Sequence, residues 1–138
     1  MADTPSEVVG QLIECFATGR FADAAELYSD DCVVFAPLAP DGPMLFGGAE
    51  ARALVKACHT ALPVRDLTIR TTPDPEVAIA EWDYVGRNPD TGQDVVTGNL
   101  LIVRVRDGRI VSERPYLDHV TRAFITGGLN PLLEALNG

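Results

Sequence analysis

The sequence predicts a single domain of the α+β class, in which helices pack on one face of an antiparallel sheet. Three observations support this prediction. Apolar residues follow a helical period to about residue 62, they follow a period of two from there to about residue 117, and a helical pattern returns from residue 119. Helices grouped before a run of strands are typical of α+β packing. A chain of 138 residues has the length of one such domain.

The first helix carries clear signals at both ends. Thr4 can act as its N-cap, Pro5 suits its first turn, and Glu7 completes a capping box with Thr4. Gly19 is a suitable residue for its end. The apolar residues between these ends recur at helical spacing and predict a buried stripe of Val8, Val9, Leu12, Ile13 and Phe16.

Shorter elements follow. We expect a short helix over residues 21–28, a short strand over residues 32–35 and a third helix over residues 49–62. Residues 36–48 hold three prolines and three glycines, which favours a loop. The residues of the third helix that we expect to be buried are Ala53, Leu54, Ala57 and Cys58.

The second half of the chain reads as a meander of strands. Strands are predicted around residues 66–70, 77–85 and 95–106 because apolar and polar residues alternate there. Asp107-Gly108 predicts a tight hairpin turn, since both residue types tolerate positive φ, and a last strand continues to about residue 117. The basic residues of this hairpin are predicted to form a solvated edge: Arg104, Arg106 and Arg109.

A helical tail, residues 119–138, completes the domain. Asp118 is expected to cap its first helix, Gly127-Gly128 interrupts it, and Pro131 suits the start of a last helix. We expect the tail to pack on the domain because it carries many apolar residues, namely Phe124, Ile125, Leu129, Leu132, Leu133 and Leu136.

The composition excludes several classes of partner. Apolar residues make up 46% of the chain and charged residues 22%, which are ordinary proportions for a globular protein. The net charge of −9 would repel phosphate backbones and anionic lipids, so we expect neither nucleic acid nor membrane as a partner. No apolar run has the roughly 20 residues of a spanning helix, and the first residues do not form a signal peptide. We therefore expect a cytoplasmic protein.

The cysteines and histidines do not predict a metal site. Cys15, Cys32 and Cys58 lie in apolar stretches without a Cys-x-x-Cys motif, which favours reduced, packed thiols. Cys58 and His59 are neighbours on a predicted helix, where their side chains diverge by about 100°. We expect no metal.

Three stretches carry a resemblance to a known superfamily. Residues 16–35 combine a helix end, a small-residue turn, a short helix and an Asp-Asp entry to a strand. Residues 46–52 (Phe-Gly-Gly-Ala-Glu-Ala-Arg) place a glycine at the start of the third helix, and residues 104–118 form a closing hairpin that ends in Tyr-Leu-Asp. On these stretches the chain resembles the nuclear transport factor 2-like superfamily, and within it the SnoaL-like and ketosteroid isomerase-like group.

The resemblance implies a fold and a class of ligand. It implies that residues 1–138 form one SnoaL-like domain, with a cone-like, strongly curved antiparallel sheet and the N-terminal helices on its concave face. It also implies a blind pocket for an apolar, oxygenated small molecule and a homodimer that packs through the outer face of the sheet. The implied function is acid–base catalysis without a cofactor, by a cyclase, isomerase, dehydratase or hydrolase. The alternative is a non-catalytic binding or structural dimer module of the same fold.

Most catalytic positions of the group hold other residue types in this chain. Isomerases of this fold carry an Asp, a Tyr and a second acid where this chain has Ala36, Leu12 and Leu101. SnoaL-type cyclases carry an acid in the last strand where it has Pro115. Limonene-type epoxide hydrolases use an acid in the second long strand, and Asp83 holds that position in this chain.

Glu113 is the first catalytic candidate. It shares a face of the last strand with Val111, Pro115 and Leu117, all of them apolar. An acid in such surroundings has a raised pKa, which suits it to proton transfer. The alternative is a structural carboxylate bound to a neighbouring arginine.

Asp83 is the second catalytic candidate, and its orientation depends on strand parity. Glu81 and Asp83 alternate with Trp82 and Tyr84, so only one of these pairs can face the pocket. The epoxide hydrolase match turns the acids inward, whereas an isomerase-like alignment turns the aromatic residues inward. We adopt the first alternative and predict that Glu113 and Asp83 project into one cavity.

The remaining candidates would bind the substrate. Asn99 and Thr97 share a strand face with Leu101, where they could offer polar groups to a ligand, or could instead bond to the backbone. The predicted apolar wall consists of Phe16, Leu101 and Leu117, joined by Trp82 in the isomerase-like alternative.

Overall fold

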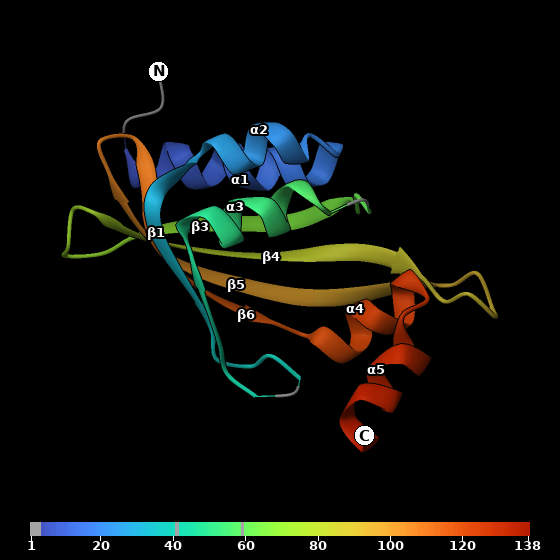
Figure 1. Cartoon of the computed structure of the whole chain (residues 1–138). Helices are drawn as coiled ribbons and strands as arrows, with labels where there is room; N and C mark the ends of the chain where they lie inside the picture. Colours follow the sequence, from blue (N-terminus) through green and yellow to red (C-terminus); the bar gives the residue numbers. More distant parts are fainter. Residues whose placement is uncertain (1–3, 41, 59) are drawn as a thin grey trace.

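The computed structural model describes residues 4–40, 42–58 and 60–138 (Figure 1). Its helices are α1 (Pro5–Thr18), α2 (Phe21–Glu26), α3 (Gly48–Lys56), α4 (His119–Thr126) and α5 (Leu129–Asn137). Its strands are β1 (Tyr28–Ala36), β2 (Met44–Gly47), β3 (Val64–Thr71), β4 (Val77–Arg87), β5 (Asp94–Arg106) and β6 (Arg109–Leu117). The predicted α+β class is confirmed.

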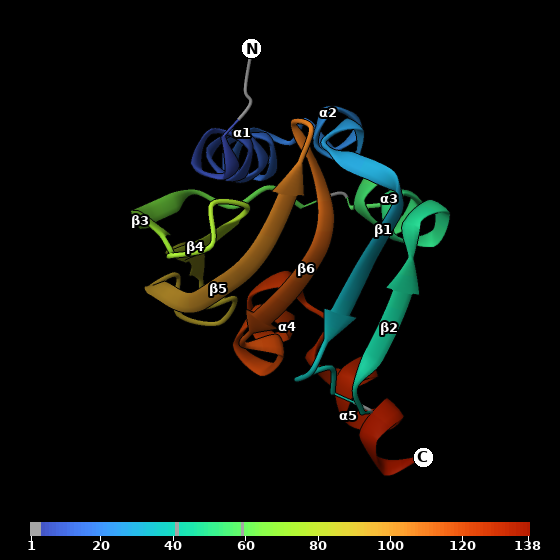
Figure 2. The same cartoon turned by 90° about the vertical axis from the view of Figure 1, so that its left-hand side faces the viewer.

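The strands form one open, curved sheet in the order β2-β1-β6-β5-β4-β3 (Figure 2). The neighbours are antiparallel except β1 and β6, which run parallel. Helices α1, α2 and α3 lie together on the concave side of the sheet (Figures 1 and 2). The parallel pair is important for the site, because it brings the start of β1 next to β6 although the two are far apart in the sequence.

The predicted N-cap and helix end are present in α1, whereas the hydrogen bonds of the described residues Thr4 and Glu7 do not include the backbone N–H bond that completes a capping box. The hydroxyl of Thr4 accepts a hydrogen bond from the backbone N–H of Glu7 at 3.2 Å and donates one to the Glu7 carboxylate at 2.8 Å. Gly19 ends the helix in the left-handed conformation, at φ 77°. The face turned to the sheet buries Val8, Val9, Leu12, Ile13 and Cys15.

The segment between β1 and α3 was predicted incompletely. Residues 44–47 are not loop but strand β2, which pairs with the end of β1. Pairing with an existing strand supplies the partners for the backbone groups of such a short segment, and a local reading of Pro and Gly content does not reveal this. The strand predicted over residues 32–35 extends over all of β1 for the same reason.

Helix α3 is shorter than predicted, and a different face of it is buried. Its inward residues are Ala51 and the partly buried Val55. The residues predicted to be buried are exposed: Ala53, Leu54, Ala57 and Cys58. The side chain of Arg52 pairs with Asp30 and, at 3.5 Å, with Glu26. The helix therefore meets β1 and α2 through small and charged residues, which a count of apolar residues does not reveal.

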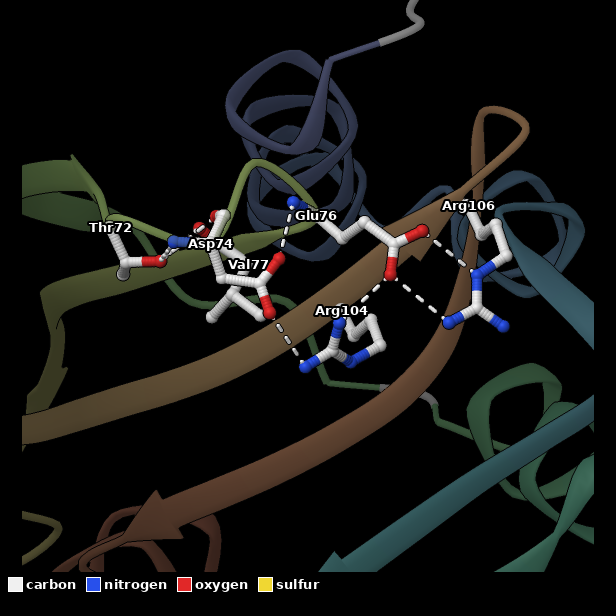
Figure 3. A network of polar contacts seen from close by, with 6 residues as sticks. All are labelled: Thr72, Asp74, Glu76, Val77, Arg104 and Arg106. Atoms are coloured by element: carbon white, nitrogen blue, oxygen red, sulfur yellow. Dashed lines mark hydrogen bonds and ion pairs between the residues drawn. The ribbon is translucent and has the colours of Figure 1, made fainter.

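The hairpin between β5 and β6 has the predicted turn, with φ of 54° at Asp107 and 75° at Gly108. Arg106 and Arg109 are exposed, as predicted, but β5 and β6 are inner strands of the sheet, and Arg104 and Arg106 pair with an acid. Figure 3 shows Glu76, in the loop between β3 and β4, bound by Arg104 at 2.8 Å and by Arg106 at 2.9 Å. These bonds lower the pKa of Glu76 to about 2. The ion pairs fasten the β3–β4 loop to the end of β5.

The tail divides into two parts. Helix α4 begins at the predicted cap, Asp118, which accepts a hydrogen bond from the backbone N–H of Thr121 at 3.0 Å. It contacts β4 and β5, whereas α5 packs mainly on α4. The predicted packing of the tail is confirmed for α4, while Leu133 and Leu136 of α5 are exposed. Among the described residues, no helix is both long and apolar enough to span a membrane.

Gly86 in β4 is the position on which α4 rests. A Cβ atom added there would overlap Cγ2 of Ile125 and lie 2.9 Å from its Cδ1. We expect Gly86→Ala to displace Ile125 and to lower the free energy of unfolding by about 1–3 kcal/mol, as overpacking does. The control is Gly98→Ala on β5, where the nearest atom would be 3.9 Å from the new Cβ. Equal urea denaturation midpoints for the two variants would contradict this docking of α4.

Candidate functional site

A cavity of about 300 Å³ lies between the concave face of the sheet, the N-terminal helices and α4. Its wall is largely apolar and aromatic, which is the usual character of a small-molecule site. The lining residues are Phe16, Phe21, Tyr28, Val55, Cys58, Thr60, Trp82, Tyr84, Leu101, Glu113, Pro115, Leu117, His119 and Arg122.

Glu113 is the acid of this cavity. Its residue exposure is 7%, and its carboxylate accepts a hydrogen bond from the Tyr28 hydroxyl at 2.6 Å. Tyr28 is fully buried as well. Because the pair lies at the buried end of the cavity while His119 and Arg122 are partly exposed, Glu113 forms the floor and α4 borders the mouth.

Burial determines the protonation of this pair. Removal of the Glu113 carboxyl from water raises its pKa from 4.5 to about 7, and the hydrogen bond from Tyr28 opposes this rise only in part. Burial, and then the charge of Glu113, raise the pKa of Tyr28 well above its usual value. At neutral pH the tyrosine is therefore a hydrogen-bond donor, and the glutamate is divided between acid and carboxylate.

Two pairings position the acid. Val34 of β1 lies beside Glu113 in the parallel pair, and Val103 of β5 lies opposite it in the antiparallel pair. A register shift in β1 between Tyr28 and Val33 separates the tyrosine from the regular ladder. As a result, the Tyr28 side chain reaches a carboxylate that is 85 residues away in the sequence.

Asp83 does not face the cavity, and the prediction that it lies there with Glu113 was wrong. The inward residues of β4 are Trp82 and Tyr84, as in the isomerase-like alternative. Asp83 lies on the outer face of the sheet, 3.6 Å from Arg65. Side chains alternate between the two faces of a strand. Because the acidic pair was taken as inward, Asp83 was predicted on the wrong face of the sheet.

The other predicted residues divide into two groups. The structure places Phe16, Trp82, Leu101 and Leu117 in the cavity wall. Thr97 and Asn99 are buried on the concave side but do not line the cavity, and Asn99 Nδ2 donates to the backbone carbonyl of Thr97 at 3.1 Å. The backbone-bonding alternative therefore describes Asn99.

Several lining groups were not predicted from the sequence. Tyr28 gave no local signal, since its role depends on the parallel pairing of β1 with β6. His119 and Arg122 did carry a local signal, because residues that are three apart lie on the same face of a helix. Within the described ranges, no three His, Cys, Asp or Glu side chains are grouped so that they could hold a metal ion. His59 lies outside the described residues.

Comparisons with known proteins agree with this fold. The family model described as the SnoaL-like domain matches residues 9–113, and a search of curated proteins finds no match. The chain is similar to the structure of a protein proposed to be an isomerase from Bacillus subtilis, with 23% identity, 88% of this chain and 91% of that chain covered, and a TM-score of 0.72.

Two further solved structures show the same fold. One is a protein proposed to be a polyketide cyclase from Streptomyces antibioticus, with 20% identity, coverage of 91% and 98% of the two chains, and a TM-score of 0.67. The other is a nuclear transport factor 2-like protein of unknown function from Burkholderia xenovorans, with 19% identity, coverage of 82% and 81%, and a TM-score of 0.59. The predicted superfamily fold is confirmed.

Proposed function

Because the chain belongs to the SnoaL-like domain family, we propose that it is an enzyme that acts on an apolar, oxygenated small molecule by acid–base catalysis without a cofactor. The reaction type that we favour is isomerisation or cyclisation. The names of two similar structures, proposed to be an isomerase and a polyketide cyclase, are consistent with this type. Dehydration and hydrolysis use the same acid–base chemistry and remain within the proposal.

The state of Glu113 is the observation that carries the proposal. General acid–base catalysis is most efficient when the pKa of the catalytic group is near the working pH. Burial brings the pKa of Glu113 to about 7, in a cavity of a size suited to a small molecule. Such a group can both accept and return a proton at neutral pH.

The proposed reaction begins with the carboxylate form of Glu113. It removes a proton from the carbon next to a substrate carbonyl, and the electron pair of that C–H bond moves into an enolate. Tyr28 holds Oε1, which leaves Oε2 to face the substrate. The protonated Glu113 then returns its proton to another carbon of the conjugated system, which completes an isomerisation. In a cyclisation the enolate carbon attacks a second carbonyl of the molecule, and the proton goes to the new alkoxide.

A non-catalytic binding module is the alternative function, and the position of Asp83 favours it. The second acid of the predicted pair lies outside the cavity beside Arg65, so Glu113 is the only carboxylate among the lining residues that the structure describes. A module of this kind would bind the ligand and release it unchanged.

Proton exchange distinguishes the two functions. We suggest incubating the protein with apolar ring ketones such as α-tetralone in D₂O and following deuterium incorporation next to the carbonyl by mass spectrometry. An acid–base enzyme should accelerate the exchange over buffer. Ketones that bind without faster exchange would favour the binding module, and absence of both binding and exchange would contradict a small-molecule function.

We also propose that the protein is a homodimer through the outer face of the sheet. Leu45, 67% exposed, lies opposite Phe35 there, and the guanidinium of Arg114 lies 5.0 Å from the Phe35 ring centre. Sedimentation equilibrium should give about twice the monomer mass of 14.8 kDa. Leu45→Glu should shift this toward the monomer, whereas Leu133→Glu, an exposed leucine of α5, should not. A monomeric wild-type protein at micromolar concentration would contradict the proposal.

A further inference from the structure

The cavity wall beside α4 holds a buried polar group without a regular hydrogen bond. Trp82 is 2% exposed and lines the cavity. Its indole Nε1 lies near the Tyr84 oxygen and favours the phenolate form of Tyr84, but it makes no regular hydrogen bond with any described residue. A buried donor that lacks a partner is unfavourable, and in native structures it usually meets a water molecule or a ligand.

Two further donors lie beside this indole. The ring centres of Trp82 and Tyr84 are 5.7 Å apart with the rings nearly perpendicular, and the guanidinium carbon of Arg122 lies 5.4 Å from the centre of the Tyr84 ring. Burial raises the pKa of Tyr84, although nearby Arg122 and Trp82 both favour its phenolate form. Tyr84 is thus a neutral O–H donor at physiological pH, and it lies between Trp82 and the guanidinium of Arg122 on the cavity wall.

The charge at the mouth is positive. Arg122 forms no ion pair with the carboxylates of the described part of the chain, although acids outnumber Lys and Arg by 20 to 11. Burial, and then the charge of Arg122, lower the pKa of His119, so this histidine is neutral at pH 7 and adds no second charge. An anionic group would therefore find an arginine that no carboxylate of the described residues occupies.

The mouth and the floor are separate sites in one cavity. Glu113 lies opposite Val103 of β5, whereas Trp82 lies opposite Asn99. These two positions of β5 are four residues apart, which corresponds to about 13 Å along an extended strand. Leu101 lines the wall between them. A ligand that touches both ends must therefore have an apolar middle.

We propose that Trp82, Tyr84 and Arg122 form a subsite for an anionic oxygen group, so that the ligand is a small amphiphile with a carboxylate or an ionised β-dicarbonyl at the mouth. Its apolar body then extends toward Glu113. Hydrogen bonds between a guanidinium and an anionic oxygen are among the strongest that proteins form. This inference deepens the proposed function and rests on it, because both require a small molecule in the cavity.

The test compares matched probes that differ in charge. Calorimetric titration with naphthoate, its methyl ester and benzoylacetone measures the preference for an anion on an apolar body. Naphthoate should bind about tenfold or more tightly than the ester. Benzoylacetone should bind more tightly above its own pKa than below it if the subsite also accepts an enolate, and an equal affinity at both pH values would restrict the subsite to carboxylates.

Variants test whether the preference for an anionic ligand arises at the mouth of the cavity. Arg122→Gln should remove the advantage of naphthoate over the ester and leave the ester affinity within about twofold. Arg70→Gln, which removes an exposed charge that pairs with Glu81, should change neither affinity. Equal affinities of acid and ester for the wild-type protein would overturn the inference and leave the proposed function intact. Binding of no probe, charged or neutral, would overturn both.

Discussion

Glu113→Gln is expected to reduce the deuterium exchange of bound ketones by about a hundredfold or more, which is the usual contribution of a general acid–base group. The substitution keeps the shape of the side chain, and its amide oxygen can still accept the hydrogen bond from Tyr28. It removes only the titrating proton. The comparison of initial exchange rates at pH 7, under saturating ketone, measures the effect.

Asp83→Asn is the matched control for this variant. It also replaces a carboxylate by an amide on the sheet, but on the outer face, beside Arg65. Its exchange rate should remain within about twofold of the wild-type rate. A Glu113→Gln protein that keeps the wild-type rate would rule out Glu113 as the catalytic group.

The same variant should be more stable than the wild type at high pH. The pKa of Glu113 is 4.5 unfolded and about 7 folded, so the folded state holds its proton more tightly. Stability from this proton is fully present below pH 4.5 and is lost as the pH rises through about 7. The loss amounts to about 3 kcal/mol. Urea titrations at pH 4 and pH 8 should therefore show a wild-type loss that Glu113→Gln lacks.

Gly48→Ser is expected to have the largest effect on stability, lowering the free energy of unfolding by about 3 kcal/mol or preventing folding. Gly48 opens α3 directly against β1. A Cβ atom at this position would overlap the carbonyl oxygen of Asp30 and lie 2.6 Å from the carbonyl carbon. Because these are backbone atoms of β1, they cannot move aside as a flexible side chain can.

The same substitution one residue earlier provides the control. Gly47 is the N-cap of α3, its φ is −87°, and a Cβ there would meet nothing within 4 Å. Serine is a favourable N-cap residue, so Gly47→Ser should leave the thermal midpoint unchanged or raise it. If the two serine variants unfold at the same temperature, the close approach of α3 to β1 does not limit stability.

Local sequence signals predicted most of the fold. The N-cap at Thr4, the turn at Asp107-Gly108 and the cap at Asp118 all depend on residues close together in the chain, and all are present in the structure. The wrong predictions concern elements whose structure depends on residues that are distant in the sequence. Strand β2 exists because β1 is beside it, and α3 buries the face that meets Asp30 rather than its most apolar face.

The candidate site was predictable only in part, for the same physical reason. Apolar neighbours in its own strand identified Glu113, and the structure buries it in the cavity. The alternation in β4 shows that Asp83 and Trp82 face opposite sides of the sheet, but it does not show which of the two faces the cavity. Tyr28 could not be connected with Glu113 from the sequence, because 85 residues separate them and a parallel strand pair joins them.

The titration of Glu113 in the free protein tests the central claim most directly, because it requires no knowledge of the substrate. Carbon-detected NMR of the glutamate side-chain carboxyls, with Glu113→Gln to assign the resonance, gives its pKa. We predict a midpoint near 7, as burial dictates, and a higher one in Tyr28→Phe, where the hydrogen bond that favours the carboxylate is absent. A midpoint near 4.5, unchanged by Tyr28→Phe, would contradict the assignment of Glu113 as a buried acid–base group.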